Sequence, residues 1–365
     1  MRMGDDDRGR RLPPGILTKI EKFATPKGDA LFGYVEKCHA DRDRRPPSSS
    51  SRRSENDVDD DKVDDSPSSS SSSFGDVLDA GTGSHSLRWM ASVLHRDRLL
   101  ESMIREGEGG RGRATGASSS DASSSSSAVV VVPSPRVTMR SYTAVTADEA
   151  MRRRVHDEAV ELGVEGMGEI VIGNWVDETL LEGRTYNTIL ADYLVGAIDG
   201  FSPYFQDRAF PRLARHLAPG GRMYVIGLQP VPDRVEGGGG GDVFCRITKV
   251  RDACILLAGH RCYREYPMDW IIRHLELSGL EVSETRTYPI RYDHGAMVRQ
   301  INVGRSKLKF FETKGMAREM GHVLDGLEKE SLEVTGRSKD GRITLGFDYV
   351  VVAEKPMEEE EGRKK

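Results

Sequence analysis

The chain has 365 residues, of which 37% are hydrophobic, 30% charged and 7% aromatic, and its formal net charge is −5 at pH 7. So small a charge does not indicate a nucleic-acid or membrane-surface partner, and no apolar run approaches the roughly 20 residues that span a bilayer. The first residues, MRMGDDDRGRR, carry three acids and no apolar segment, which indicates neither a signal peptide nor a transit peptide. We therefore expect a cytoplasmic protein with no nucleic-acid or membrane partner.

The four cysteines, Cys38, Cys245, Cys254 and Cys262, form no CxxC pair and have no ligand spacing. Reduced, unbridged thiols in an intracellular protein are the expectation, and no metal site is predicted.

Two polar segments contain too few apolar residues to offset the entropy of ordering them. They cover residues 40–73 and 105–127, and both are rich in serine. We expect both to be disordered insertions. Residues 1–39 are expected to form an arm and a helix, which opens with Thr25 as N-cap and Pro26 as its first residue. Residues 357–365 form a charged tail.

Strand and helix patterns alternate in the rest of the chain. Strands are expected at 74–80, 137–145, 169–172, 186–191, 222–228, 279–290 and 342–355. Helices are expected around 87–94, 147–163 and 269–277, and from 205 to a stop at Pro219-Gly220-Gly221. This alternation predicts βαβ units and an α/β, doubly wound, mainly parallel sheet.

A glycine turn follows the first of these strands, with the pattern Gly81-x-Gly83-x-x-Ser86 preceded by Asp79. Glycine has no Cβ, so a ligand can approach the backbone of such a turn closely. Dinucleotide-binding turns have a third glycine where this chain has Ser86, which argues against a nicotinamide-dependent enzyme. Asp79 is expected to organise the turn by accepting backbone hydrogen bonds.

Four segments in order resemble the motifs of the class I S-adenosylmethionine-dependent methyltransferases. They are VLDAGTG (77–83), RTYNTILADYL (184–194), LAPGGRMYVIG (217–227) and the closing pair GLEV and GFDYVVVAEK. The resemblance covers residues 74–356, apart from the second insertion. It implies a Rossmann-like methyltransferase fold, in which the seven-stranded sheet ends in an antiparallel strand, and it implies S-adenosyl-L-methionine as the cofactor.

The resemblance also assigns cofactor binding to residues at the ends of the strands: Asp79, Gly81, Thr82, Gly83, Thr146, Asp148, Asn174, Trp175, Asp192 and Tyr193. Thr146 stands near the position where the family usually has an acid for the ribose. Either Asp148 reaches the ribose instead, or the threonine contact suffices. Asn174 is expected to accept from the adenine amine through its carbonyl oxygen, and Trp175 to cover the adenine face.

The predicted activity is methyl transfer to a small-molecule acceptor. Asp192 and His85 are the candidate catalytic residues, with His260 as a further candidate base. The alternative is a non-catalytic interaction protein on the same fold. Residues 293–340 show helical patterning between the last two strands, and we expect them to form a lid over the carboxyl edge of the sheet.

Overall fold

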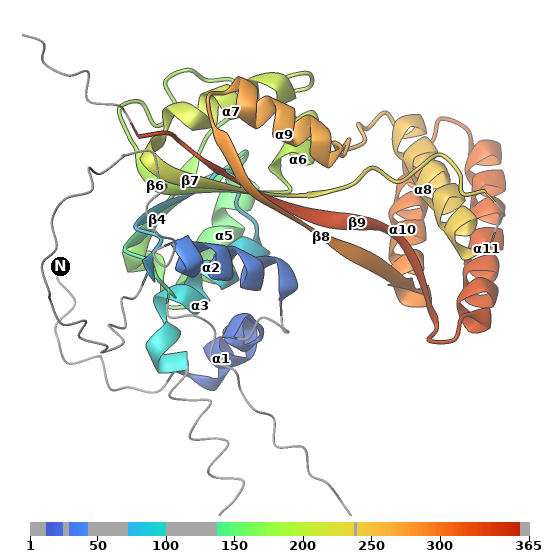
Figure 1. Cartoon of the computed structure of the whole chain (residues 1–365). Helices are drawn as coiled ribbons and strands as arrows, with labels where there is room; N and C mark the ends of the chain where they lie inside the picture. The colour runs from blue at the N-terminus through green and yellow to red at the C-terminus, as the bar shows by residue number, and fades with distance from the viewer. Residues whose placement is uncertain (1–11, 25–28, 43–71, 100–136, 237–238, 358–365) are drawn as a thin grey trace, which may run out of the picture. The chain divides into compact units, whose positions relative to one another are not determined.

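A computed structural model describes residues 12–24, 29–42, 72–99, 137–236 and 239–357 (Figure 1). By backbone contacts the chain divides into two compact units. Unit 1 comprises the described residues up to 77, with 84–142 and 155–169; unit 2 comprises 78–83, 143–154 and everything from 170 onward. Among the described helices, none combines the length and apolar character needed to cross a bilayer.

Seven strands form one sheet in the order β5-β4-β2-β6-β7-β9-β8. Their bounds are β2 Asp76–Asp79, β4 Ser141–Thr146, β5 Gly168–Ile172, β6 Tyr186–Asp192, β7 Leu217–Leu228, β8 Glu281–Asp293 and β9 Arg342–Glu354. Strands β6 and β7 are parallel, whereas β9 is antiparallel to both of its neighbours, β7 and β8. The predicted fold class, a seven-stranded sheet whose last strand in the chain is antiparallel, is confirmed. Strands β1 (Ser72–Ser73) and β3 (Val137–Thr138) form a separate parallel pair.

Most of the chain between these strands is helical. The helices are α1 Pro14–Ile20, α2 Ala30–Arg42, α3 Ser84–Leu94, α5 Glu149–Glu161, α6 Leu194–Phe201, α7 Gln206–Arg215, α8 Gly240–Leu257, α9 Met268–Leu277, α10 His294–Lys307 and α11 Lys314–Arg337, with short 3-10 turns at Glu21–Ala24, Glu165–Met167 and Leu308–Phe310. Gly163 follows α5 and has a φ of 66°, the left-handed conformation that is common after the end of a helix. The helix predicted over 147–163 was expected to stop at this glycine.

The core of unit 2 is built from the apolar central strands. Val350, Val351 and Val352 of β9 are fully buried opposite Tyr224, Val225 and Ile226 of β7. Runs of apolar residues in β6, β7 and β9 favour a strand that is covered on both faces. Helices α6, α7 and α9 contribute Ile198, Phe210 and Ile271 among others to this core cluster.

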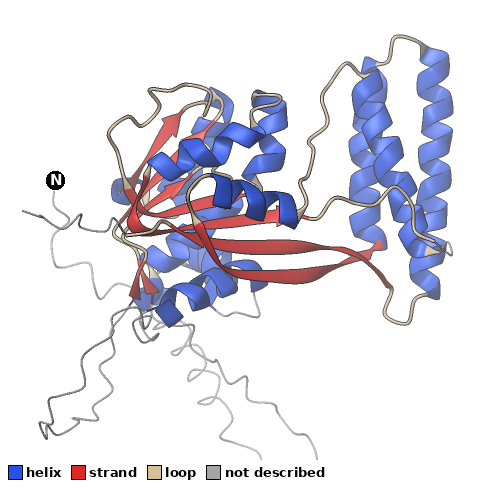
Figure 2. Ribbon diagram, turned by 45° about the horizontal axis from the view of Figure 1, so that its top comes forward, coloured by secondary structure: helices blue, strands red, loops and turns tan. Residues whose placement is uncertain are grey.

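Helices α8, α10 and α11 lie side by side, next to the far end of the long β8–β9 ribbon (Figure 2). They enclose an apolar cluster of their own, which includes Phe244, Ile247, Met297, Ile301 and Leu324. This cluster is separate from the main core of unit 2, and Tyr292, Ile343 and Leu345 of the β8–β9 ribbon pack against it.

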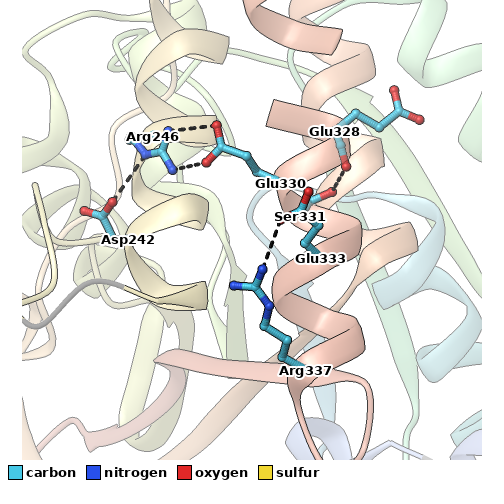
Figure 3. A network of polar contacts seen from close by, with 7 residues as sticks. All are labelled: Asp242, Arg246, Glu328, Glu330, Ser331, Glu333 and Arg337. Atoms are coloured by element: carbon cyan, nitrogen blue, oxygen red, sulfur yellow. Dashed lines mark hydrogen bonds and ion pairs between the residues drawn. The ribbon is translucent and has the colours of Figure 1, made fainter. Parts of the chain in front are cut away.

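Polar contacts connect α8 to α11 on the surface of this three-helix group (Figure 3). The Arg246 guanidinium donates to Glu330 of α11 and to Asp242 one turn earlier in α8. These hydrogen bonds raise the pKa of Arg246 and lower that of Glu330. Exposed pairs of this kind each contribute about 1 kcal/mol or less, so the apolar cluster carries most of the stability.

Unit 1 has a buried ion pair at its centre. Glu36 of α2 accepts from Arg96, 2.6 Å away, and from the indole N–H of Trp89 in α3, 3.1 Å away. The Phe32 ring stacks on Trp89 with centroids 4.8 Å apart. Burial raises the pKa of Glu36, although the Arg96 charge opposes the shift.

Several predicted boundaries differ from the structure, and the strand predicted at 137–145 is divided into β3 and β4, which belong to different sheets. Pro219-Gly220-Gly221 does not end a helix: α7 ends at Arg215, and the three residues lie within β7, where Gly220 has a φ of 70°. A glycine with a positive φ occurs both after the end of a helix and at an irregular position within a strand. The Pro-Gly-Gly motif alone therefore did not distinguish these two structures. The ends of the first predicted insertion are ordered, in α2 up to Arg42 and in β1 at Ser72–Ser73. The rest of that insertion, the whole of 105–127, Thr25, Pro26 and most of the tail lie outside the described residues.

Candidate functional site

A pocket with a cavity volume of about 270 Å³ lies at the ends of the strands, and every residue that lines it belongs to unit 2. Its walls come from five places: the glycine turn after β2, the segment after β4, the loop after β5, helix α6 with the residues behind it, and Tyr263 in the connection between α8 and α9. Seven of the ten predicted cofactor-binding residues line it: Gly81, Thr82, Gly83, Thr146, Asp148, Asn174 and Trp175. The structure therefore brings together, around one pocket, residues up to 94 positions apart in the chain.

The glycine turn is fixed to the strands on both sides by backbone hydrogen bonds. Ala80 N–H donates to the Leu190 carbonyl, and Thr82 N–H to the Val145 carbonyl, each at 2.9 Å. Asp79 is fully buried, and its Oδ1 lies 3.5 Å from the Gly81 N–H, in line with its predicted role in the turn. Among the described residues, no atom lies within 4 Å of a Cβ built on Gly83.

Thr146 and Asp148 occupy the wall after β4. The Thr146 hydroxyl is buried, and within the described residues it has no hydrogen-bond partner. Asp148 caps helix α5: its Oδ1 accepts from the Met151 N–H at 2.8 Å. A carboxylate can accept further hydrogen bonds with its second oxygen while it caps a helix.

Asn174 and Trp175 form the wall after β5. The Asn174 Oδ1 accepts from the Ser202 hydroxyl at 2.6 Å and from the Val176 N–H at 3.1 Å. The oxygen predicted to accept from an adenine amine is thus already engaged, which ties this loop to the end of α6. The Trp175 indole is 5% exposed and donates to the Ala80 carbonyl at 2.7 Å.

Asp192 ends strand β6 and Tyr193 precedes helix α6, but neither lines the pocket. Tyr193 has a φ of 48°, an uncommon conformation for a residue with a side chain. Its hydroxyl donates to Asp348 Oδ1 of β9 at 2.8 Å. Burial and the Asp348 carboxylate raise the pKa of Tyr193, so this hydroxyl stays protonated.

Glu265, in the connection between α8 and α9, approaches the same end of the sheet. Burial raises its pKa to about 7, and the charge of Asp348 adds to the shift. A Cβ built on Gly196 of α6 would lie 2.8 Å from its Oε2, so the carboxylate rests directly against the helix backbone. A carboxyl group that ionises near neutral pH can accept or hold a proton there.

The two candidate histidines do not line the pocket either. In unit 1 the Nε2 of His85 lies 2.9 Å from Asp29 Oδ2, and its Nδ1 lies 3.3 Å from the Lys22 ammonium. Burial raises the pKa of Asp29, but the hydrogen bonds from His85 and Phe32 outweigh it, so the net shift is downward. His260 is exposed and contacts the edge of the Phe310 ring. The catalytic roles of Asp192, His85 and His260 stay predictions.

All four cysteines are buried and form no disulfide within the described residues, and burial raises the pKa of Cys245, Cys254 and Cys262. No group of three or more potential metal ligands occurs among the described residues.

Sequence reasoning missed most of the apolar wall of the pocket. Its members are Val145, Met151, Leu194, Ala197, Ile198, Phe201, Phe205 and Tyr263. The Gly200–Phe205 segment, at the end of α6, carries a signal for part of it, because its aromatic residues lie close together in a short stretch with glycine, serine and proline. None of residues 293–340 is among those that line the pocket, so their role as a lid stays a prediction.

No protein-family model and no curated protein sequence matches the chain. Solved structures with a similar fold include a proposed methyltransferase from Bacillus halodurans, with 15% identity and a TM-score of 0.38 over 60% of this chain and 84% of that one. An S-adenosylmethionine-dependent methyltransferase from Methanosarcina mazei has 10% identity and a TM-score of 0.37 over 78% of this chain and 93% of that one. The [4+2]-cyclase SpnF has 16% identity and a TM-score of 0.32 over 60% and 66%.

These likenesses concern the fold alone. With its strand order and its antiparallel β9, the chain has the fold of the class I S-adenosylmethionine-dependent methyltransferases. The pocket lies where open α/β sheets bind ligands, outside the carboxyl ends of the strands.

Proposed function

We propose that the protein transfers a methyl group from S-adenosyl-L-methionine to a small-molecule acceptor. The observation that carries this proposal is the single pocket shared by the glycine turn, Thr146, Asp148 and Asn174. These are the positions that the methyltransferase resemblance assigned to the cofactor. The cavity volume of this pocket, about 270 Å³, lies just below the range of about 300–1,000 Å³ typical of small-ligand sites. This volume suits the adenosine part of the cofactor.

The residues present fit this cofactor. Thr146 offers a buried hydroxyl with no partner among the described residues, which a ribose hydroxyl would satisfy. No described atom lies within 4 Å of a Cβ built on Gly83, and the methionine end of the cofactor would pass beside this part of the turn. The apolar wall of α6 suits the faces of a purine.

When bound, S-adenosylmethionine supplies a methyl carbon that its sulfonium makes electrophilic. The chain's own task is then to orient the two reactants and exclude water, because alignment supplies much of the rate. Thr146 and Asp148 would hold the ribose, and the glycine turn would approach the methionine end. Asp192 and Glu265 do not line the pocket, and one of them would have to take the proton from an acceptor that carries one.

Equilibrium binding tests the proposal directly. Isothermal titration calorimetry with S-adenosylmethionine and S-adenosylhomocysteine should detect binding to the unmodified chain. Gly83→Leu adds a side chain to the turn and should abolish binding, whereas Gly315→Leu, at an exposed glycine of α11 whose built Cβ likewise meets no atom within 4 Å, should not change it. Absence of binding to the unmodified chain would contradict the proposal.

Turnover separates the enzyme from the alternative of a non-catalytic interaction protein. The chain is incubated with S-adenosylmethionine labelled on the methyl carbon and with a small-molecule cell extract. Label in a new low-mass product supports methyl transfer. Cofactor binding without any such product over repeated extracts would favour the interaction protein.

A further inference from the structure

We infer that Tyr263 is a ligand-contacting residue of this pocket and covers the purine of a bound adenosyl group. The inference rests on the proposed function and deepens it. Tyr263 lies in the connection between α8 and α9, outside every motif that carries the methyltransferase resemblance. Among the residues that line the pocket, it alone follows β7 in the chain.

Two glycines of α6 allow this connection to lie directly on the helix. A Cβ built on Gly200 would lie 2.5 Å from Cε1 of the Tyr263 ring, and one built on Gly196 would lie 2.8 Å from Oε2 of Glu265. Real Cβ atoms do not come so close to other atoms. Residues 196 and 200 are one turn apart, so they share one face of α6, and any larger residue there would push the connection away.

Further contacts hold the connection on both sides of Tyr263. The Cys262 thiol lies 3.5 Å from the Asp252 carbonyl of α8, and the Tyr349 hydroxyl of β9 donates to the Tyr266 carbonyl at 2.7 Å. The ring is therefore carried by a segment attached to α6, α8 and β9. A ring held in this way loses little entropy when it contacts a ligand.

The Tyr263 side chain keeps a large free surface. It is 55% exposed, although it touches Gly200 and lines the pocket together with Phe201 and Phe205. Aromatic and apolar side chains on one wall favour a planar, polarisable group over a charged one. Of the parts of S-adenosylmethionine, only the purine has such faces.

The test measures the dissociation constant of S-adenosylhomocysteine by calorimetry for Tyr263→Ala, Tyr263→Phe and Gly200→Ala. We expect Tyr263→Ala to weaken binding about tenfold, because aromatic stacking on a base is lost, and Tyr263→Phe to bind as the unmodified chain does. Gly200→Ala should weaken binding to a similar degree, because the new methyl group displaces the ring.

Two controls match these changes. Tyr204→Ala removes a tyrosine that is 86% exposed and does not line the pocket. Gly326→Ala adds the same methyl group within helix α11, where it meets no atom within 4 Å. Both should bind as the unmodified chain does, and melting temperatures without ligand show that all variants fold.

The possible failures are distinguishable. If the unmodified chain binds S-adenosylhomocysteine and Tyr263→Ala binds it equally well, Tyr263 is not a ligand contact, while the proposed function stands. If Tyr263→Ala and both controls weaken binding alike, the effect is not specific, and the inference is again overturned. If the unmodified chain binds neither adenosyl compound, the proposed function and the inference both fall.

Discussion

The indole N–H of Trp175 donates to the carbonyl oxygen of Ala80 at 2.7 Å, which joins the loop after β5 to the glycine turn after β2. Trp175 is also part of the apolar core cluster and of the pocket wall. One side chain therefore fixes the shape of the turn that the proposed cofactor would approach.

Replacing Trp175 by phenylalanine should affect both stability and binding. The ring is largely preserved, but the buried Ala80 carbonyl loses its donor, which costs about 1–3 kcal/mol of unfolding free energy. The looser turn should also weaken S-adenosylhomocysteine binding. Denaturant titration and calorimetry measure the two effects. Trp270→Phe is the control: it changes a partly buried tryptophan that does not line the pocket, and unchanged binding is expected there.

Thr146→Val should separate stability from ligand binding. The substitution removes a buried hydroxyl that has no partner among the described residues, so the unfolding free energy should rise by about 1 kcal/mol. Binding of S-adenosylhomocysteine should weaken, because the contact to the ribose is lost.

Thr335→Val provides the matched control for this change. Its hydroxyl is buried but donates to the Ser331 carbonyl at 2.8 Å, so its removal should give no gain in stability and leave binding unchanged. Equal binding by Thr146→Val and the unmodified chain would show that Thr146 does not contact the ligand.

Glu265 should make stability fall as the pH rises. Burial raises its pKa in the folded chain to about 7, above the usual glutamate pKa of 4.5. Between these two values the folded state binds more protons than the unfolded state, so the unfolding free energy decreases with increasing pH. Glu265→Gln should therefore raise the melting temperature at pH 8 and change it little at pH 4.5.

The exposed Glu276 of α9 provides a comparison within the same unit, since Glu276→Gln should shift the melting temperature equally at both pH values. If Glu265→Gln behaves like Glu276→Gln, the Glu265 carboxyl does not titrate near neutral pH.

In unit 1, Arg96→Met should leave the Glu36 carboxylate buried without its cation. Removing one partner of a buried pair costs about 3–5 kcal/mol, and the loss should be larger at pH 7 than at pH 5, because Glu36 can then be protonated at the lower pH. The double variant Glu36→Gln with Arg96→Met keeps an acceptor for Trp89 and should recover most of the loss. A double variant as unstable as Arg96→Met alone would show that the arginine acts through packing rather than charge.

Local patterns determined the strands, the glycine turn and the order of the motifs. An apolar run such as Val350–Val352 predicts a strand that is buried on both faces of the sheet. A turn such as Gly81–Gly83 follows from residues that are adjacent in the chain. The parallel strands, once recognised, place their carboxyl ends at one edge of a sheet. This is why seven residues predicted from the sequence surround one pocket.

Only the tertiary structure decided the rest of the wall. Tyr263 reaches the pocket because Gly200, far from it in the chain, leaves room for its ring, and the contacts of His85 with Asp29 and Lys22 likewise join distant segments. Such contacts depend on the shapes of two packed surfaces. A periodicity reports which face of an element is buried, but it does not report which side chain lies against it.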